Sequence, residues 1–236
     1  MGKYKGLLST DDPRAPWQWE PRARRYRGPR GQWIGVNSMR ELKEQFIEAQ
    51  KAKMEKLVER MANGDITRRE WVLASREVIK GTYVDLYALS KGGRGAMTQS
   101  DYGKLGAMLK GQYQRLQEFE AALRDGKLTQ RGAAYRARLY INSARQAFQA
   151  GYTASYGVPT LPAQPGDGST ACRANCRCEW KITELADAWE CYWTLGAAEH
   201  CDDCRRRAAQ WNPLRIPKSM ARFRVDLDSV LTALVG

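Results

Sequence analysis

The sequence predicts a mainly α-helical protein: two successive αα-hairpins, followed near the C-terminus by a small Cys-rich β-hairpin module that resembles a zinc ribbon. Apolar residues recur at three- and four-residue spacing between residues 38 and 156, which is typical of helices with one buried face. All six cysteines lie between Cys172 and Cys204. Because the N-terminus lacks the apolar stretch of a secretory signal, this local cluster favours a metal site over a disulfide framework.

We expect four regions along the chain. The first is a basic, Pro- and Trp-rich arm over residues 1–37, and the second is a helical domain over 38–156. A Pro/Gly-rich loop from Gly157 marks the next boundary. It opens a Cys-rich zinc module over 157–216, and a tail over 217–236 follows.

Capping residues mark the start of each expected helix: Ser38 with Glu41, Thr67 with Glu70, Ser100 or Thr98, and Thr129. The last of these helices is expected to run on to Tyr152. Turns at Asn63-Gly64 and Asp125-Gly126 join the two helices of each hairpin. The glycines from Gly92 to Gly95 separate the two hairpins.

The arm combines prolines, aromatic residues and arginines. Its prolines exclude a continuous helix, whereas its tryptophans are unusual for a disordered tail. We therefore expect an irregular segment without a core of its own, ordered mainly against a partner. Its basic run consists of Arg22, Arg24, Arg25, Arg27 and Arg30.

The cysteines fall into two groups on either side of a predicted β-hairpin, whose strands are 176–182 and 192–195. Two groups of cysteines on either side of a hairpin can bring four thiolates together, and this arrangement predicts a tetrahedral Zn²⁺ site. The expected ligands are Cys201, Cys204 and two of Cys172, Cys176 and Cys178. Strand alternation would turn Cys178 toward Trp180 and the core, which favours Cys172 and Cys176.

Three alternatives accompany this assignment. Cys191 is expected to be a buried free thiol. His200, the only histidine, could replace one cysteine ligand. The cluster could also consist of buried cysteines without metal.

The net charge of +13, from 39 Lys and Arg against 26 Asp and Glu, bears on partners more than on fold. A basic protein is attracted to polyanions such as nucleic acid or acidic protein surfaces. The expected contacts are the arm arginines together with Arg205, Arg206 and Arg207. The alternative is a basic surface that is merely solvated. No apolar stretch is long enough for a membrane span.

The sequence argues against an enzyme. A single histidine excludes His-pair metal chemistry. Neither a P-loop nor a Gly-x-Gly-x-x-Gly motif occurs between a predicted strand and helix. The acidic residues lie mostly at helix caps or on helix faces, where solvation explains them. We expect no catalytic residues and no small-molecule substrate.

Several segments resemble the head-morphogenesis proteins of tailed phages, in the Mu-F-like minor head group. The specific ones lie in the Cys-rich region: Leu161–Ser169, Asn175–Trp180, Trp193–Gly196, His200–Cys204 and Trp211–Pro213. Weaker similarity includes Leu89–Arg94 and Gly126–Thr129. The resemblance covers roughly residues 40 to 215.

This resemblance implies a virion protein near the portal vertex, assembled in the bacterial host cytoplasm and acting in head assembly, DNA packaging or ejection. Its expected partners are portal and capsid proteins and, non-specifically, packaged DNA. It implies no cofactor beyond a metal. The alternative is a zinc-ribbon-like regulator that binds nucleic acid directly.

Overall fold

The structure is a computed structural model that describes residues 17–28 and 31–219. Arg30 and the tail from residue 220 onward lie outside these residues. The mainly helical class with small antiparallel sheets is confirmed. None of the helices in the described part of the chain is long and apolar enough to cross a bilayer.

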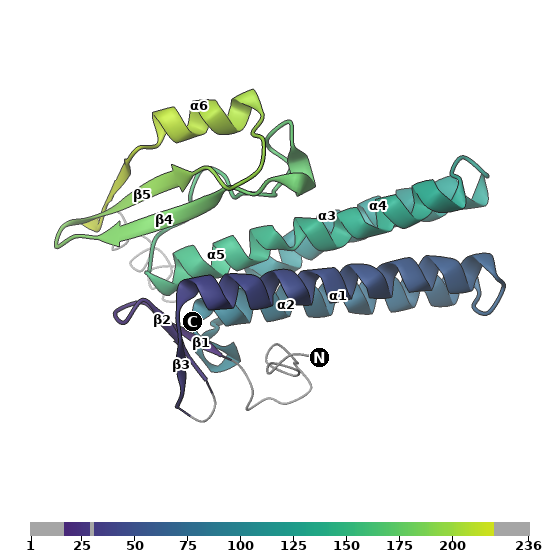
Figure 1. Cartoon of the computed structure of the whole chain (residues 1–236), viewed down its shortest axis with the longest axis horizontal. Coiled ribbons are helices and arrows are strands. Elements are labelled where there is room, and N and C mark those ends of the chain that lie inside the picture. Colours follow the sequence, from purple (N-terminus) through teal and green to yellow (C-terminus); the bar gives the residue numbers. More distant parts are fainter. Residues whose placement is uncertain (1–16, 29–30, 220–236) are drawn as a thin grey trace, which may run out of the picture.

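Within the described residues, five helices form the body of the protein (Figure 1). They are α1 (Val36–Ala62), α2 (Arg68–Lys91), α3 (Gln99–Arg124), α4 (Gln130–Ser143) and α5 (Arg145–Ser155). Helix α1 packs mainly against α4, and α2 packs mainly against α5. The turns from α1 to α2 and from α3 to α4 lie at one end of the body. The opposite end, where α1 begins and α5 ends, carries both sheets.

The caps of three helices agree with the sequence analysis. Thr67 and Glu70 form a reciprocal capping box at α2, and Thr98 with Asp101 does the same at α3, which decides between Thr98 and Ser100. The Thr129 side chain accepts a hydrogen bond from the amide of Gly132.

The predicted cap at Ser38 is wrong. Helix α1 starts at Val36 with Gly35 as its N-cap, so Ser38 lies inside the first turn. The reason is that strand β3 (Trp33–Ile34) ends directly before Gly35, whose extended backbone turns straight into the helix.

The helix expected from Thr129 to Tyr152 is broken once, at Ala144. Just before the break, the hydroxyl of Ser143 donates to the carbonyl of Leu139, four residues back, a bond that bends helices. The amide of Ala144 bonds to Ile141, three residues back. The break lets α4 lie along α1 and α5 lie along α2.

The expectation of a separate arm is wrong for the described part of residues 1–37. Strands β1 (Gln18–Glu20), β2 (Arg25–Arg27) and β3 form an antiparallel sheet. Trp17, Trp19 and Tyr26 are buried in the same core as the helices. The ring of Trp19 packs against that of Tyr152 of α5, with 5.6 Å between the ring centroids. These aromatic residues therefore anchor the segment to its own body.

The Cys-rich module has a core of its own. Strands β4 (Glu179–Glu184) and β5 (Ala188–Thr194) form the predicted hairpin, with Trp180 opposite Trp193. Helix α6 (Asp202–Gln210) follows, close to the expected position. Strand β6 (Leu214–Pro217) then pairs with β5 and was not predicted. It crosses the expected boundary between module and tail.

Candidate metal centre

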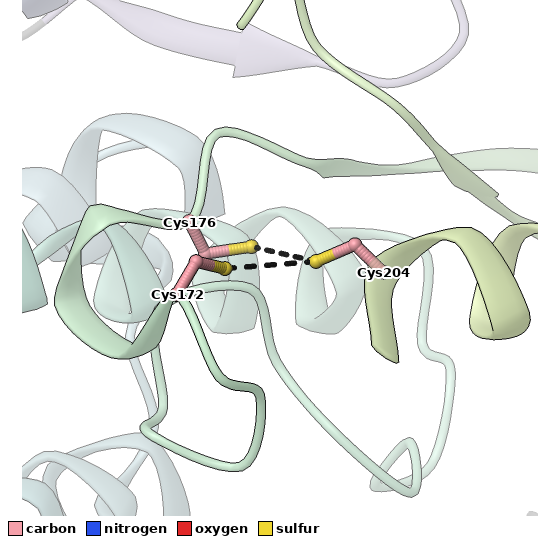
Figure 2. Close-up of side chains that lie close together, drawn as sticks. All are labelled: Cys172, Cys176 and Cys204. Atoms are coloured by element: carbon pink, nitrogen blue, oxygen red, sulfur yellow. Dashed lines mark hydrogen bonds between the residues drawn. The ribbon is translucent and has the colours of Figure 1, made fainter. Parts of the chain in front are cut away.

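Three thiols converge between the loop before β4 and the start of α6. The Sγ atoms of Cys172, Cys176 and Cys204 all lie within 4.8 Å of one another. The Sγ of Cys204 is 3.6 Å from that of Cys172 and 3.7 Å from that of Cys176. Figure 2 shows the first two side chains pointing toward Cys204 from the other side of the site. These three cysteines could hold a metal ion.

Local structure fixes both halves of this site. Cys172 and Cys176 flank a short 3₁₀ turn, Arg173–Asn175, so both side chains emerge from the same turn. Cys204 lies in the first turn of α6, after the N-cap residue Cys201. The amide of Ala171 donates to Asp203 of this helix at 2.9 Å, which ties the two halves together.

A second link holds α6 in place. The guanidinium of Arg207 donates to the carbonyl of Ser169 at 2.9 Å. The same guanidinium lies over the rings of Trp193 and Trp211. These two rings pack with Trp180 into a cluster that shares a hydrophobic core with Cys176 and Cys204.

The remaining two predicted ligands lie beside the three thiols. Burial alone would raise the pKa of Cys201, but hydrogen bonds from the amides of Cys204 and Cys172 lower it. Cys178 lies close enough to Cys176 to lower the pKa of its thiol. Of the five predicted ligands, the structure therefore groups Cys172, Cys176 and Cys204, whereas Cys201 and Cys178 lie outside this group.

The thiols differ in how readily they ionise. Hydrogen bonding to the Cys178 thiol, together with the Cys178 amide, lowers the pKa of Cys176 to about 5. Burial, followed by the negative charge of Cys176, raises the pKa of Cys204. Without a cation, the negative charges of neighbouring buried thiolates repel one another. A divalent metal would remove this opposition and bind them as thiolates.

His200 contacts the edge of the site. Its Nδ1 lies 3.7 Å from the Sγ of Cys178, and its Nε2 lies 2.8 Å from the carbonyl oxygen of Gly196. If Nε2 carries the ring proton, it donates a hydrogen bond to that carbonyl oxygen. The unprotonated Nδ1 then faces the thiol of Cys178. Cys191 lies apart from the site on β5 as a buried free thiol, and burial raises its pKa to about 11.

The predicted arginine contacts fall into two classes. Arg22, Arg24, Arg25 and Arg27 are exposed on the β1–β2 hairpin, and none has an ion-pair partner among the described residues. In contrast, Arg205 pairs with Asp202 at 2.8 Å and Arg206 pairs with Asp203 at 2.6 Å. Much of the charge of the α6 arginines is therefore compensated locally.

Sequence reasoning missed the polar contacts that join the module to the helical body. Glu179 of β4 accepts hydrogen bonds from Lys43 and Arg40 of α1. Glu44 of α1 pairs with both Arg145 and Arg177. These residues lie far apart in the chain, and no local pattern pairs them.

Comparisons of the chain with protein-family models, with curated proteins and with solved structures found no significant match.

Proposed function

We propose that this protein is a structural minor head protein of a tailed phage, placed near the portal vertex, with a zinc-stabilised C-terminal module. The observation that carries the proposal is where the resembling segments lie. Residues 161–169, 175–180, 200–204 and 211–213 are separate in sequence, yet they surround one thiol cluster and one tryptophan cluster. The resemblance thus follows a folded unit, which supports it over a chance likeness of short motifs.

Zinc is the metal that the site favours. Thiolates in a tetrahedral arrangement bind Zn²⁺ or an iron–sulfur cluster. Zinc suits a structural site whose four ligands come from one small module. Cys172, Cys176 and Cys204 would supply three of them. Cys201 is the proposed fourth, because it is the N-cap residue of the helix that carries Cys204, and the pKa of its thiol is lowered by contacts with Cys172 and Cys204. Cys178 and His200 then form a neighbouring pair that can orient the site.

A structural role for the metal fits its surroundings. Cys176 and Cys204 are buried in the same hydrophobic core as the tryptophan cluster. A catalytic zinc site needs one open position for water or substrate. Four cysteine ligands would leave none, so the metal would stabilise the module, and we propose no enzymatic activity.

The partners proposed for this role are portal and capsid proteins and, non-specifically, packaged DNA. The β1–β2 hairpin is the proposed contact, because its arginines are exposed and unpaired within the described residues. The same observation supports the second candidate, a nucleic-acid-binding regulator. The two candidates differ in where the protein resides.

Mass spectrometry of purified virions from the encoding phage tests the proposal. A head protein should copurify with particles through a density gradient, at a constant ratio to the portal protein. It should be absent from tails separated from heads. A protein found only in the host cell lysate would contradict the proposal and favour the regulator.

A further inference from the structure

A cleft of about 280 Å³ lies where the N-terminal sheet, the helical body and the Cys-rich module meet. Figure 1 shows both sheets at this end of the body. Aromatic rings from all three parts line the cleft, among them Trp19, Phe148 and Trp180. Ligand sites in proteins occur preferentially at such junctions, with apolar walls and a few polar groups.

Positively charged side chains outnumber negatively charged ones in the lining of this cleft. Among the described lining residues, Glu179 is the only carboxylate, whereas the cations are Arg24, Arg40, Lys43 and Lys181. Lys43 and Arg40 both bond to Glu179 and neutralise it. Arg24 and Lys181 have no ion-pair partner among the described residues, so the cleft attracts anions.

The basic surface continues beyond the cleft. Arg24 belongs to the β1–β2 hairpin, which also exposes Arg22, Arg25 and Arg27.

The cleft also offers polar groups to a planar ligand. The hydroxyls of Tyr152 and Tyr156 are 3.5 Å apart, longer than an ordinary hydroxyl hydrogen bond.

We propose that this cleft receives an unpaired base of a single-stranded nucleic acid, while the hairpin arginines bind the neighbouring phosphates. Single-stranded nucleic acid is a polymer that carries one negative charge and one flat ring per unit. Aromatic side chains stack on bases, and arginines bind phosphates, with little dependence on sequence. This inference goes beyond the proposed function and does not depend on it.

The test compares strands that differ only in their bases. Fluorescence anisotropy would measure the binding of the full chain to labelled oligothymidine of about 15 nucleotides, near the upper site size of single-strand-binding folds. An abasic strand of equal length keeps every phosphate. Stacking of one base should make oligothymidine bind roughly tenfold more tightly than the abasic strand. Equal affinities would overturn the proposal.

Two matched variants locate the site. Val36 is 40% exposed and lines the cleft, so Val36→Trp should fill it and reduce the tenfold preference to near unity. Leu73→Trp, at an exposed position on α2 outside the cleft lining, should keep the preference. Circular dichroism would establish that both variants are folded. A Val36→Trp protein that is folded and keeps the preference would overturn the proposal.

Two further probes distinguish ligand sources. Oligouridine tests RNA beside oligothymidine, and a preference for either strand supports the proposal and identifies the polymer. An acidic peptide containing tryptophan tests a protein segment as the natural occupant. If this peptide displaces oligothymidine at a lower concentration than unlabelled oligothymidine does, a protein partner replaces nucleic acid and the proposal fails.

Discussion

The Nζ of Lys43 lies 3.2 Å from the Oε1 of Glu179, and this ion pair joins α1 to the first strand of the Cys-rich module. The Lys43 side chain is 6% exposed, whereas that of Glu179 is 31% exposed. Burial lowers the pKa of Lys43, and the Glu179 carboxylate opposes this effect. The Glu179 carboxylate therefore favours the charged form of this buried amine at the junction of the two cores.

Glu179→Gln should destabilise the protein by roughly 2 kcal/mol, because it leaves the Lys43 charge uncompensated. This is less than the loss for a fully buried pair, since Glu179 is partly exposed. Chemical denaturation at neutral pH measures the change. Glu41→Gln, at an exposed α1 position without an ion pair within the described residues, should stay within about 0.5 kcal/mol.

The same pair predicts a pH dependence. Burial would raise the pKa of Glu179, but Lys43 and Arg40 outweigh burial and lower it below 4.5. The folded protein therefore holds this carboxylate ionised more strongly than the unfolded chain does. The resulting stability is present above pH 4.5 and is lost as the pH falls through the folded pKa. Melting curves of Glu179→Gln should show a smaller loss on acidification than the wild type. Equal losses would mean that the pair contributes nothing.

The proposed metal site predicts about one zinc per chain in protein purified without chelator. Cys204→Ser should lose the metal, whereas Cys191→Ala should retain it, because Cys191 lies outside the cluster. Elemental analysis measures both variants. Chelation should lower the wild-type Tm by about 5 °C or more, since about 2–4 °C corresponds to 1 kcal/mol at this chain length. A metal-free wild type with an unchanged Tm would refute the site.

The buried N-terminal aromatics predict a stability effect. Trp19 is 4% exposed in the helical core, so Trp19→Ala should cost about 3–5 kcal/mol. Trp33 belongs to the same sheet but is 47% exposed, and Trp33→Ala should change stability by less than about 1 kcal/mol. Urea denaturation compares the two. Similar small effects would restore the interpretation of this segment as a separate arm.

Close packing of α2 against α5 predicts opposite effects of two glycine substitutions. A Cβ at Gly151 would lie 2.4 Å from the carbonyl oxygen of Tyr87 on α2, so Gly151→Ala should force the helices apart and destabilise the protein by about 2 kcal/mol. Gly103 on α3 has open space around it. Gly103→Ala should therefore stabilise the protein by up to about 1 kcal/mol through helix propensity. Thermal melting distinguishes them, and a stabilised Gly151→Ala would contradict the close approach.

The two arginine groups should differ in their contribution to duplex DNA binding. Replacing Arg22, Arg24, Arg25 and Arg27 with alanine should reduce the salt slope of binding by up to about 4, roughly one for each lost phosphate contact. Replacing Arg205 and Arg206 should change it little, because both are paired with aspartates. Titrations with unrelated duplexes at several salt concentrations test this. A larger effect of the α6 pair would reverse the assignment.

Local patterns predicted most of the elements. The side chains of Thr67 and Thr129 each cap a helix by binding the amide three residues further along the chain. A short stretch of sequence is therefore enough to predict both helix starts. The existence of the β4–β5 hairpin was predicted from the alternation of its first strand. Its bounds were not, because β4 begins at Glu179, after Cys176 and Cys178, and β5 already begins at Ala188. The register that places Trp180 opposite Trp193 came from the structure. Strand β6 was missed because its residues pair across a long connection that contains α6.

The sequence by itself determined the helical class and a cysteine set with the spacing of a metal site, because periodicity and thiol chemistry are properties of short segments. Only the tertiary structure decided that Trp19 and Tyr26 belong to the helical core, that the Arg205 and Arg206 charges are compensated, and that Glu179 binds Lys43. Each of these depends on the partner that a side chain finds. Burial and pairing are set by distance in space, which the order of residues along the chain does not contain.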